Sequence, residues 1–491
     1  MRYQNPVLRG FYPDPSICCV DGVYYMVCSS FQYFPGIPLF ESRDLVNWTQ
    51  IGHVLTRREQ IMLENIASSG GVFAATIRHH DGRFYVTTTN NTTQQNFYVW
   101  TENIYGAWSD PIFVQQDGID PSFYFENGNT YFMSTGVDDF GVSGIIQSQI
   151  DLQTGKKLTP SRSIWKGTGG RYVEGPHLYK IGDWYYLLAS EGGTEYGHML
   201  TLCRSKSMWG PFENCPHNPI LTNRNKAPYP IQAIGHGELL IGPDGNWYIP
   251  TLGFRQTDIW MPYHHLGREV FLTPATLEDD GWFYCGDGTT WESYDVPLPG
   301  QQKRKQLWTF ENTQWDVDWC FLRHPDRNCY ELHRDRAVLY GSQITLEEAK
   351  SPTWIGLRQR DFHGIVTCRI SADGGEAGLC AYMTEQEHYM VGIRKTDSDW
   401  EVFVRLRIGD ISHIQATYPI SAGSVRLRIR MDALRYYFEL VLNEEVIPLA
   451  SAQTKYLSSE VAAGFTGVLL SLYAVGNNRA EFWDFSCIYD E

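Results

Sequence analysis

The sequence lacks the features that would place the chain in a membrane or on a nucleic acid. No uninterrupted apolar run approaches the ~18 residues that a membrane-spanning helix needs. The first residues, Met1-Arg2-Tyr3-Gln4-Asn5-Pro6, contain no apolar signal core, so we expect no secretion by that route. Basic residues are too few, 40 against 56 acidic ones, for a broad nucleic-acid or anionic-membrane surface. The net charge of −16 is instead compatible with a neutral substrate.

The eleven cysteines show no pattern typical of a metal or redox site. None belongs to a Cys-x-x-Cys pair, which argues against zinc knuckles and thioredoxin-like sites. The adjacent Cys18 and Cys19 are poorly spaced for disulfides. We therefore expect buried, inert thiols and a reducing, cytoplasmic compartment. No Gly-x-Gly-x-x-Gly after a strand and no Walker motif is present, so we expect no redox or nucleotide cofactor.

Aromatic residues, by contrast, are plentiful. They make up 14% of the chain, with 30 tyrosines and 16 tryptophans. Aromatic side chains favour β-strands, and their rings also stack on sugars. The composition therefore indicates a strand-rich protein and is compatible with a carbohydrate ligand.

One short unit recurs five times in the first 295 residues: a turn glycine, two residues, and then a tyrosine that opens an apolar strand. The copies start at Gly22, Gly82, Gly128, Gly182 and Gly245. Asp or Asn precedes most of these glycines, which is a strong hairpin signal. Repeats of about 40–60 residues, each a small antiparallel sheet, predict a five-bladed β-propeller. The alternative is five unrelated hairpins in one all-β domain, because Gly-x-x-Tyr is a loose pattern.

The position eight residues before each glycine, nine in the last copy, is polar in four of the five copies. The residues there are Asp14, Ala74, Asp120, Glu174 and His236. Because the first strand of each propeller blade lines the central channel, we expect these side chains to meet at one end of it. Carboxylates held close together raise each other's pKa, and buried ones are rare unless they are paired. The cluster therefore indicates a working site rather than a structural one.

Two opposed carboxyl groups are the minimal equipment for glycoside hydrolysis. One donates a proton to the leaving oxygen, and the other attacks the sugar or activates water. A separation of about 5–5.5 Å implies retention and about 6.5–9.5 Å implies inversion, but the sequence does not determine this distance. Pro15 and Pro121 favour an extended backbone at the preceding Asp14 and Asp120. The longer side chain of Glu174 is better suited to reach a leaving-group oxygen.

Several motifs surround these positions. They are Asn5-Pro6-Val7-Leu8, Tyr12-Pro13-Asp14-Pro15-Ser16, Phe34-Pro35-Gly36-Ile37-Pro38, Glu174-Gly175-Pro176-His177-Leu178-Tyr179, Ile231-Gln232-Ala233-Ile234-Gly235-His236 and Leu266-Gly267-Arg268-Glu269. In this order they strongly resemble glycoside hydrolase family 43, above all its β-xylosidase-like branch. The resemblance implies a five-bladed propeller enzyme that acts with inversion, in a family made up mainly of β-xylosidases and α-L-arabinofuranosidases.

The resemblance also implies roles for the three carboxylates. Asp14 corresponds to the general base that activates water, and Glu174 to the general acid. Asp120 corresponds to a third carboxylate that orients the acid, tunes its pKa and contacts the sugar. The resemblance also implies a substrate-binding set that comprises Phe31, Phe34, Phe73, His198 and Arg268.

His236 has three readings. It is a satisfied core residue, a hydrogen-bond partner of Glu174 or Asp14, or a metal ligand. In many members of the family the matching histidine helps to hold a central, largely water-coordinated calcium ion. One imidazole is a poor calcium site by itself, since calcium takes six to eight oxygen ligands. We therefore expect no required cofactor, with calcium as an open option.

The sequence departs from the family pattern in the second repeat. Phe73 stands where tryptophan is usual, Ala75 where proline is usual and Thr76 where aspartate is usual. Glu195 also stands where a smaller residue is common. These departures leave the preferred sugar open more than the reaction.

A second domain begins after a change of pattern near residue 298. Residues 299–305 form a polar linker, and residues 402–408 and 425–431 alternate between apolar and basic side chains. Such alternation predicts strands of a two-sheet β-sandwich. We therefore predict a propeller at 1–298 and a sandwich at 306–491. The second region resembles the concanavalin-like sandwich of the same branch, which implies that one of its loops closes the pocket.

These observations predict an exo-glycosidase that removes terminal pentoses from short xylo- or arabino-oligosaccharides. The leading prediction is a xylan 1,4-β-xylosidase. An α-L-arabinofuranosidase, or an enzyme with both activities, is the close alternative. A non-catalytic propeller lectin is disfavoured because all three carboxylates are present. The five-bladed fructan-hydrolase family is also disfavoured, because its motifs are replaced in this chain. We expect no nucleic-acid or membrane partner. Whether the chain forms a homo-oligomer stays open.

Overall fold

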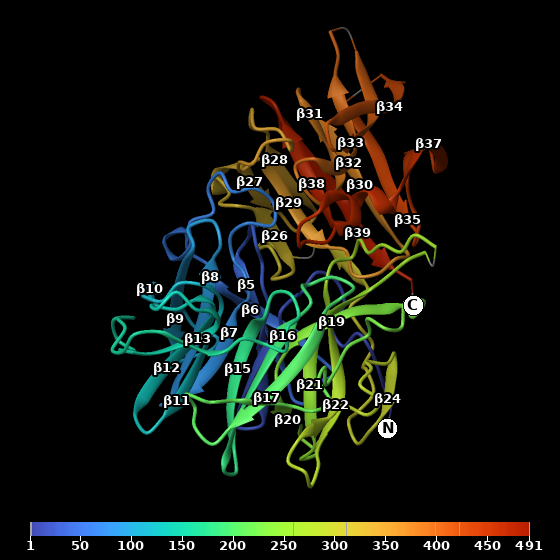
Figure 1. The fold of residues 1–491 in the computed structure, drawn as a ribbon. Helices are drawn as coiled ribbons and strands as arrows, with labels where there is room; N and C mark the ends of the chain where they lie inside the picture. The colour runs from blue at the N-terminus through green and yellow to red at the C-terminus, as the bar shows by residue number, and fades with distance from the viewer. Residues whose placement is uncertain (1, 259, 311, 398, 422, 491) are drawn as a thin grey trace.

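The computed structural model describes residues 2–258, 260–310, 312–397, 399–421 and 423–490. Figure 1 shows a ring of small sheets, coloured blue to yellow-green, with a second β-rich body beside its upper face. The ring contains five sheets and the second body two. The predicted all-β fold, a five-bladed β-propeller followed by a β-sandwich, is confirmed.

The five blades follow one another along the chain. Blade I contains β2 (Ser16–Val20), β3 (Val23–Val27), β5 (Gly36–Ser42) and β6 (Thr49–Leu55). Blade II contains β7 (Thr76–His80), β8 (Arg83–Asn90), β9 (Gln95–Thr101) and β10 (Ile112–Phe113). Blade III contains β11 (Ile119–Glu126), β12 (Asn129–Val137), β13 (Ser143–Ile150) and β14 (Arg162–Trp165). Blade IV contains β15 (Glu174–Ile181), β16 (Trp184–Glu191), β17 (Met199–Ser205) and β18 (Glu213–Asn214). Blade V contains β19 (Ile231–Gly237), β20 (Leu240–Ile241), β21 (Trp247–Arg255), β22 (Glu269–Leu277) and β23 (Phe283–Tyr284).

The repeated glycines close the first hairpin of their blades. In blade I, Asp21 and Gly22 connect β2 to β3 with φ values of 50° and 75°. A two-residue hairpin with positive φ at both positions has a type I′ turn, which favours Asp-Gly and Asn-Gly. Asp81-Gly82 and Asn127-Gly128 have the same signs of φ. A Cβ at Gly22 would meet nothing, so the backbone angle and not the available space requires glycine there.

The ring is closed by the N-terminal segment. β1 (Arg2–Gln4) pairs with β24 (Ser293–Asp295), which follows blade V. Leu8 then forms a bridge with Val270 in β22, so the chain passes along blade V before it enters blade I. The first strands of the blades line the central channel, which places Asp14 and its equivalents around one axis.

The sandwich consists of two antiparallel sheets of eight strands each. One sheet contains β25 (Leu307–Thr309), β27 (Tyr330–Leu332), β28 (Arg336–Tyr340), β30 (Gly364–Ala372), β35 (Ser424–Met431), β36 (Arg435–Leu442), β37 (Glu445–Gln453) and β39 (Arg479–Tyr489). The other contains β26 (Trp319–Leu322), β29 (Thr353–Arg358), β31 (Glu376–Tyr382), β32 (Glu387–Lys395), β33 (Trp400–Ile408), β34 (Ile411–Ile420), β38 (Leu469–Val475) and β4 (Tyr33–Phe34). A large core of buried apolar side chains lies between the two sheets.

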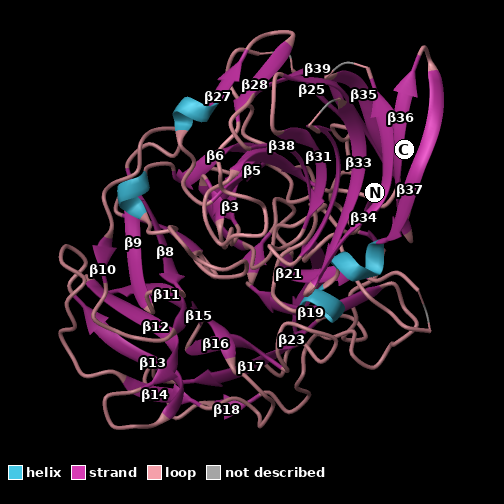
Figure 2. Cartoon of the chain, turned by 90° about the horizontal axis from the view of Figure 1, so that it is seen from above, coloured by secondary structure: helices cyan, strands magenta, loops and turns pink. Residues whose placement is uncertain are grey.

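The two domains share secondary structure. β4 belongs to the loop between two strands of blade I, yet it pairs with β26 at the edge of a sandwich sheet. Arg323, which directly follows β26, is fully buried, and its Nε donates to the Ile66 carbonyl at 2.6 Å. Arg323 also pairs with Glu385. In Figure 2 the sandwich strands lie over one side of the ring. These contacts hold the sandwich in one position over the channel mouth.

Helical structure is sparse and short. It comprises α1 (Ser459–Ala462) and the 3₁₀ turns η1 (Arg58–Gln60), η2 (Arg327–Cys329) and η3 (Thr454–Leu457). In the part of the chain that the structure describes, no helix is long and apolar enough to cross a membrane. α1 matters for function because Ser459 and Glu460, together with Phe465 shortly after it, line the pocket.

Candidate active site

The structure brings the four predicted polar positions together at one end of the channel. Asp14 lies just before β2, Asp120 lies in β11, Glu174 begins β15 and His236 lies in β19. The ladders of β11, β15 and β19 shift register next to these residues. Such β-bulges re-aim side chains and are common beside active sites. Ala74, the fifth equivalent, is buried in blade II and brings no functional group.

The prediction of an extended backbone at the two aspartates is wrong. Asp14 has φ 56° and Asp120 has φ 55°, both in the left-handed region. Each lies where the chain turns into the first strand of its blade, and this turn outweighs the preference of the following proline. Residues held at such angles cost on the order of 1–3 kcal/mol and cluster at functional sites. The angles direct both side chains towards the channel.

Asp14 is buried beside positive and hydrogen-bonding groups. Its Oδ1 lies 3.4 Å from Nη1 of Arg268 and 3.7 Å from Nδ1 of His236. Its Oδ2 accepts a short hydrogen bond from the Ser29 hydroxyl. Burial alone would raise the pKa of Asp14, but these partners outweigh burial and lower it below its ordinary value. Asp14 is therefore ionised at neutral pH, as a base requires.

Asp120 has the opposite electrostatic environment. Burial, together with repulsion from Glu174 and Asp14, raises the pKa of Asp120 to about 7, although His236 opposes the shift. The site therefore keeps one exchangeable proton near neutral pH next to an ionised aspartate.

Replacing Asp120 by asparagine is expected to stabilise the fold while impairing catalysis. The folded-state pKa lies above the unfolded value near 4, so folding takes up protons between about pH 4 and pH 7. Asp120 therefore lowers stability as the pH rises through that window, by an amount on the order of 2–4 kcal/mol. Thermal unfolding of D120N should show a gain that is larger at pH 8 than at pH 5. A greater loss of stability at pH 8 than at pH 5 would contradict the assignment.

His198 lies directly behind Glu174. It is fully buried, and its Nδ1 lies 3.1 Å from the Ala233 carbonyl oxygen, to which it can only donate. Its Nε2 has no hydrogen-bond partner and lies 3.6 Å from Oε1 of Glu174. The imidazole ring packs against Gly235, where a Cβ would approach it to 2.4 Å. His198 is thus held rigidly with its Nε2 facing Glu174.

Arg268 links the carboxylates to the pocket wall. Its Nη1 donates to Thr194 Oγ1 at 2.8 Å, and its Nη2 donates to the Phe465 carbonyl at 3.2 Å. The guanidinium carbon lies 5.7 Å from the centre of the Phe31 ring. Its Nε is buried without a partner. The guanidinium therefore connects Asp14, Thr194 and the Phe465 carbonyl at the edge of the pocket.

Three aromatic rings surround this guanidinium. Phe31 lies 5.4 Å from Phe73 and 5.8 Å from Phe465, measured between ring centres. Phe73 lies 5.9 Å from Phe465. The predicted Phe31 and Phe73 are therefore together, and the sandwich adds the third ring. Apolar ring faces beside polar donors are typical of sites that bind sugars and other small molecules.

Phe34 does not lie with this group. It is buried in β4, and its ring packs against His324 of the sandwich at 4.9 Å. It belongs to the apolar core shared by blades I and II. Since β4 joins a sandwich sheet, we assign Phe34 to the joint between the domains rather than to the pocket wall.

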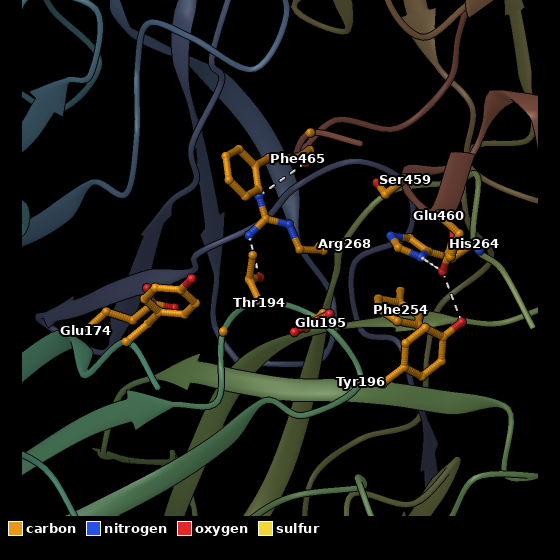
Figure 3. A pocket seen from close by; sticks show the side chains of 13 residues that line it. Glu174, Thr194, Glu195, Tyr196, Phe254, His264, Arg268, Ser459, Glu460 and Phe465 are labelled. Atoms are coloured by element: carbon orange, nitrogen blue, oxygen red, sulfur yellow. Dashed lines mark hydrogen bonds and ion pairs between the residues drawn. The ribbon is translucent and has the colours of Figure 1, made fainter. Parts of the chain in front are cut away.

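A pocket of about 490 Å³ opens over Glu174 and Arg268 (Figure 3). Its far wall is a network across the two domains, in which Glu460 of α1 accepts from Nδ1 of His264 at 2.8 Å and from the Tyr196 hydroxyl at 3.0 Å. The sequence did not single out several residues of its lining, namely Tyr172, Thr194, Tyr196, Phe254, His264, Glu460 and Phe465. Thr194 and Tyr196 flank Glu195, which departs from the family pattern, but nothing in the sequence marks Phe465 or Glu460.

Removing the Phe465 ring is expected to weaken substrate binding. Its contacts with Phe31 and Phe73 close the pocket, and such ring contacts contribute about 0.5–1.5 kcal/mol beyond burial. Phe465→Ala should raise KM for a short substrate by about 2- to 10-fold with little change in kcat. Leu434→Ala, at another exposed apolar side chain of the sandwich, is the control. An unchanged KM would show that the sandwich does not contribute to binding.

The residues around His236 do not form a calcium site built from protein ligands. Nδ1 of His236 faces Asp14, and that carboxylate already has Ser29 and Arg268 as partners. Calcium takes six to eight oxygen ligands at about 2.3–2.6 Å. Across the described ranges, no group of three or more His, Cys, Asp and Glu side chains is arranged to hold a metal ion.

The next layer of the channel already contains a cation. Arg78 of blade II donates from Nη1 to Oε1 of Glu238 at 2.9 Å, and its Nη2 lies 2.9 Å from Nδ1 of His177. Glu238 also accepts from the Ser16 hydroxyl and the Ile17 amide, so both of its oxygens are occupied. Burial and the neighbouring guanidinium lower the pKa of His177 to about 3, which leaves it neutral. The positive charge of this layer is therefore that of Arg78.

Comparison with known proteins gives a consistent result. The family model of Glycosyl hydrolases family 43 matches residues 3–283, and that of the Beta xylosidase C-terminal Concanavalin A-like domain matches residues 308–487. The non-reducing end alpha-L-arabinofuranosidase BoGH43B of Bacteroides ovatus is 38% identical, over 99% of this chain and 95% of its own. A Xylosidase/arabinosidase of Butyrivibrio fibrisolvens is 33% identical, over 97% of this chain and 96% of its own.

Solved structures agree over the whole chain. The Bacteroides ovatus Xyloglucan PUL GH43B structure superposes with a TM-score of 0.93 at 36% identity and covers 100% of both chains. A xylan beta-1,4-xylosidase from Bacillus halodurans superposes with a TM-score of 0.92 at 29% identity, over 99% of this chain and 100% of its own. The resemblance inferred from the motifs is confirmed, and the chain belongs to glycoside hydrolase family 43 and is a glycoside hydrolase.

Proposed function

We propose that the protein is an inverting exo-glycosidase that removes terminal β-D-xylosyl or α-L-arabinofuranosyl units from short oligosaccharides. The observation that carries the proposal is the meeting of Asp14, whose pKa is lowered, and Asp120, whose pKa is raised to about 7, with Glu174 at one end of the channel. The wall that the sandwich adds at Phe465 and Glu460 supports exo-action, because it limits how far a chain extends past the site.

The proposed reaction uses each carboxylate once. Asp14 takes a proton from a water molecule as the water oxygen attacks the anomeric carbon. Glu174 donates its proton to the glycosidic oxygen as the carbon–oxygen bond breaks. Asp120 is a positioning residue that keeps a proton available to Glu174 through their mutual repulsion. Transfer of a proton from Asp14 back to Glu174 through solvent restores the starting state.

The choice between the two pentoses rests on the relatives and on one ring. The relatives include an arabinofuranosidase, an enzyme named for both sugars and a Xylan 1,3-beta-xylosidase. Phe73 offers a smaller stacking face than the tryptophan usual in the family, and it packs on Phe31 and Phe465. We propose that both pentoses are accepted. An α-L-arabinofuranosidase alone is the second candidate, favoured by the 38% identical relative.

The test compares two nitrophenyl glycosides. Nitrophenol should be released from both the β-D-xyloside and the α-L-arabinofuranoside. The ratio of the two kcat/KM values identifies the preferred sugar. Nuclear magnetic resonance of the first-formed sugar should show the anomer opposite to that of the substrate. Turnover of neither glycoside, or release of the same anomer, would overturn the proposal.

We propose that no divalent ion is needed. Arg78 already supplies a positive charge in the channel, and the oxygens of Glu238 are occupied. Dialysis against EDTA is therefore expected to change kcat/KM by less than about twofold, with no calcium binding detected by calorimetry. Loss of activity that calcium restores would contradict this. Measurement of the melting temperature with and without calcium separates a structural effect from a catalytic one.

We further propose a reducing compartment. All eleven cysteines are free thiols, and most of them are buried. Burial raises the pKa of the thiols, for example to about 11 for Cys320 and about 12 for Cys285, which keeps them protonated and unreactive.

A further inference from the structure

Tyr172 combines high exposure with a position beside the proposed acid. It precedes Glu174 by two residues and lines the same pocket, yet it is 67% exposed. Single exposed aromatic residues are common on protein surfaces and need no explanation by themselves. Two further observations separate Tyr172 from that ordinary case.

The first observation is the backbone of Tyr172. Its φ is 54°, in the left-handed region that aromatic residues rarely adopt. Such a conformation costs on the order of 1–3 kcal/mol and persists only where surrounding contacts hold it. A glycine would adopt the same angle without strain. The chain therefore maintains an unfavourable backbone where it presents a phenol ring to solvent.

The second observation is the anchoring of the residues that directly precede Tyr172. The buried carboxylate of Glu191 accepts from the amides of Thr168 and Gly170 at 2.8 and 2.7 Å. The Arg171 carbonyl accepts from the Gly192 amide at 2.7 Å. The Arg171 guanidinium lies 5.4 Å from the centre of the Tyr172 ring and pairs with Glu195. These contacts hold the segment in place, so the ring is preorganised.

The backbone of Gly193 lies close to the Tyr172 ring. A Cβ at Gly193 would lie 3.2 Å from the Tyr172 ring, so any larger residue there would push the ring away. Gly193 itself has φ 80° and lines the pocket. The ring thus lies between the Gly193 backbone and the Arg171 guanidinium, and the residue stays 67% exposed where it lines the pocket.

We propose that Tyr172 is the platform on which the first sugar of the leaving group stacks, and that it is a specificity-determining residue of this enzyme. The proposal rests on the proposed function. Glu174 protonates the glycosidic oxygen, so the sugar beyond that oxygen lies next to Glu174, on the side where Tyr172 lines the pocket. A flat ring matches the apolar C–H face of a neutral pyranose, and a preorganised ring binds it with little loss of entropy.

The experiment compares substrates with and without a leaving-group sugar. Xylobiose has one, and β-D-xylosyl fluoride has none; the arabinofuranosyl equivalents replace them if that sugar is preferred. Tyr172→Ala is expected to lower kcat/KM for the disaccharide about tenfold, mainly through KM, and to leave the fluoride within about twofold. Tyr172→Phe keeps the ring and should behave like the wild type. Tyr105→Ala, at a tyrosine 64% exposed in blade II, is the matched control.

Tyr172→Gly distinguishes a loss of binding from misfolding, because glycine adopts φ 54° freely. It should show the same selective loss as Tyr172→Ala with a melting temperature at or above that of the wild type. Equal losses on both substrates, or no loss on the disaccharide, would overturn the proposal. Failure of the wild type to cleave any pentoside would instead overturn the proposed function, and the platform with it.

Discussion

Replacing Glu174 by alanine is expected to lower kcat for a pento-disaccharide by about 10²–10⁴-fold. Glu174 begins β15 beside the Asp120 carboxylate, and Nε2 of His198 lies 3.6 Å from its Oε1. In the proposed mechanism it supplies the proton that the departing sugar oxygen needs. Without that proton the oxygen would leave as a strongly basic alkoxide.

The size of this loss should depend on the leaving group. A dinitrophenolate leaves without protonation, so E174A should cleave a dinitrophenyl glycoside much more nearly at the wild-type rate than it cleaves the disaccharide. Glu102→Ala, at an exposed glutamate of blade II, controls for the loss of a carboxylate. An equal loss for both leaving groups would assign Glu174 a different role, and no loss would remove it from the site.

Replacing Asp14 by asparagine should cause a loss of about 10²–10⁴-fold that does not depend on the leaving group. Arg268, His236 and Ser29 lower the pKa of Asp14, so it is the carboxylate best suited to accept a proton from water. Asparagine has the same shape but no basic oxygen. Since water attacks in every turnover, good and poor leaving groups should suffer alike.

The matched control for D14N is Asp21→Asn in the same blade. Asp21 lies in the exposed hairpin turn with φ 50°, which asparagine tolerates. The control should keep wild-type activity. If D14N showed the strong leaving-group dependence expected of E174A, the roles of acid and base would be exchanged.

The pH dependence connects these variants to the third carboxylate. Because the pKa of Asp120 is raised to about 7, wild-type activity should fall as the pH rises through that region and Asp120 loses its proton. The same repulsion that keeps the proton lowers the stability of the fold. An active site that is unfavourable for folding is the expected consequence of holding three carboxylates around one axis.

Much of the fold could be predicted from repetition. Asp21-Gly22, Asp81-Gly82 and Asn127-Gly128 form the predicted hairpins because local turn chemistry determines their φ angles. Asp14, Asp120, Glu174 and His236 could be grouped because equivalent positions of propeller blades converge on one axis. That inference needs only a count along the chain, and no knowledge of how the domains pack.

The rest of the site depends on tertiary contacts that cannot be found by counting positions along the chain. The Asp14 backbone follows the turn into β2 rather than the preference of its proline. Phe34 was placed in the pocket from its motif, but it lies in the joint between the domains because β4 pairs with a sandwich strand. Tyr172 carries no sequence signal, since its importance comes from the angle at which its segment is held.

The sequence by itself determined the five blades, the sandwich and the meeting of the catalytic carboxylates, because repeated local patterns encode each of them. Only the tertiary structure decided which residues surround the sugar. Phe31 and Phe465 are far apart in the chain, and they meet because the sandwich is fixed on the propeller through β4 and Arg323. Packing between domains joins residues with no shared local pattern, so it emerges only when the whole chain is folded.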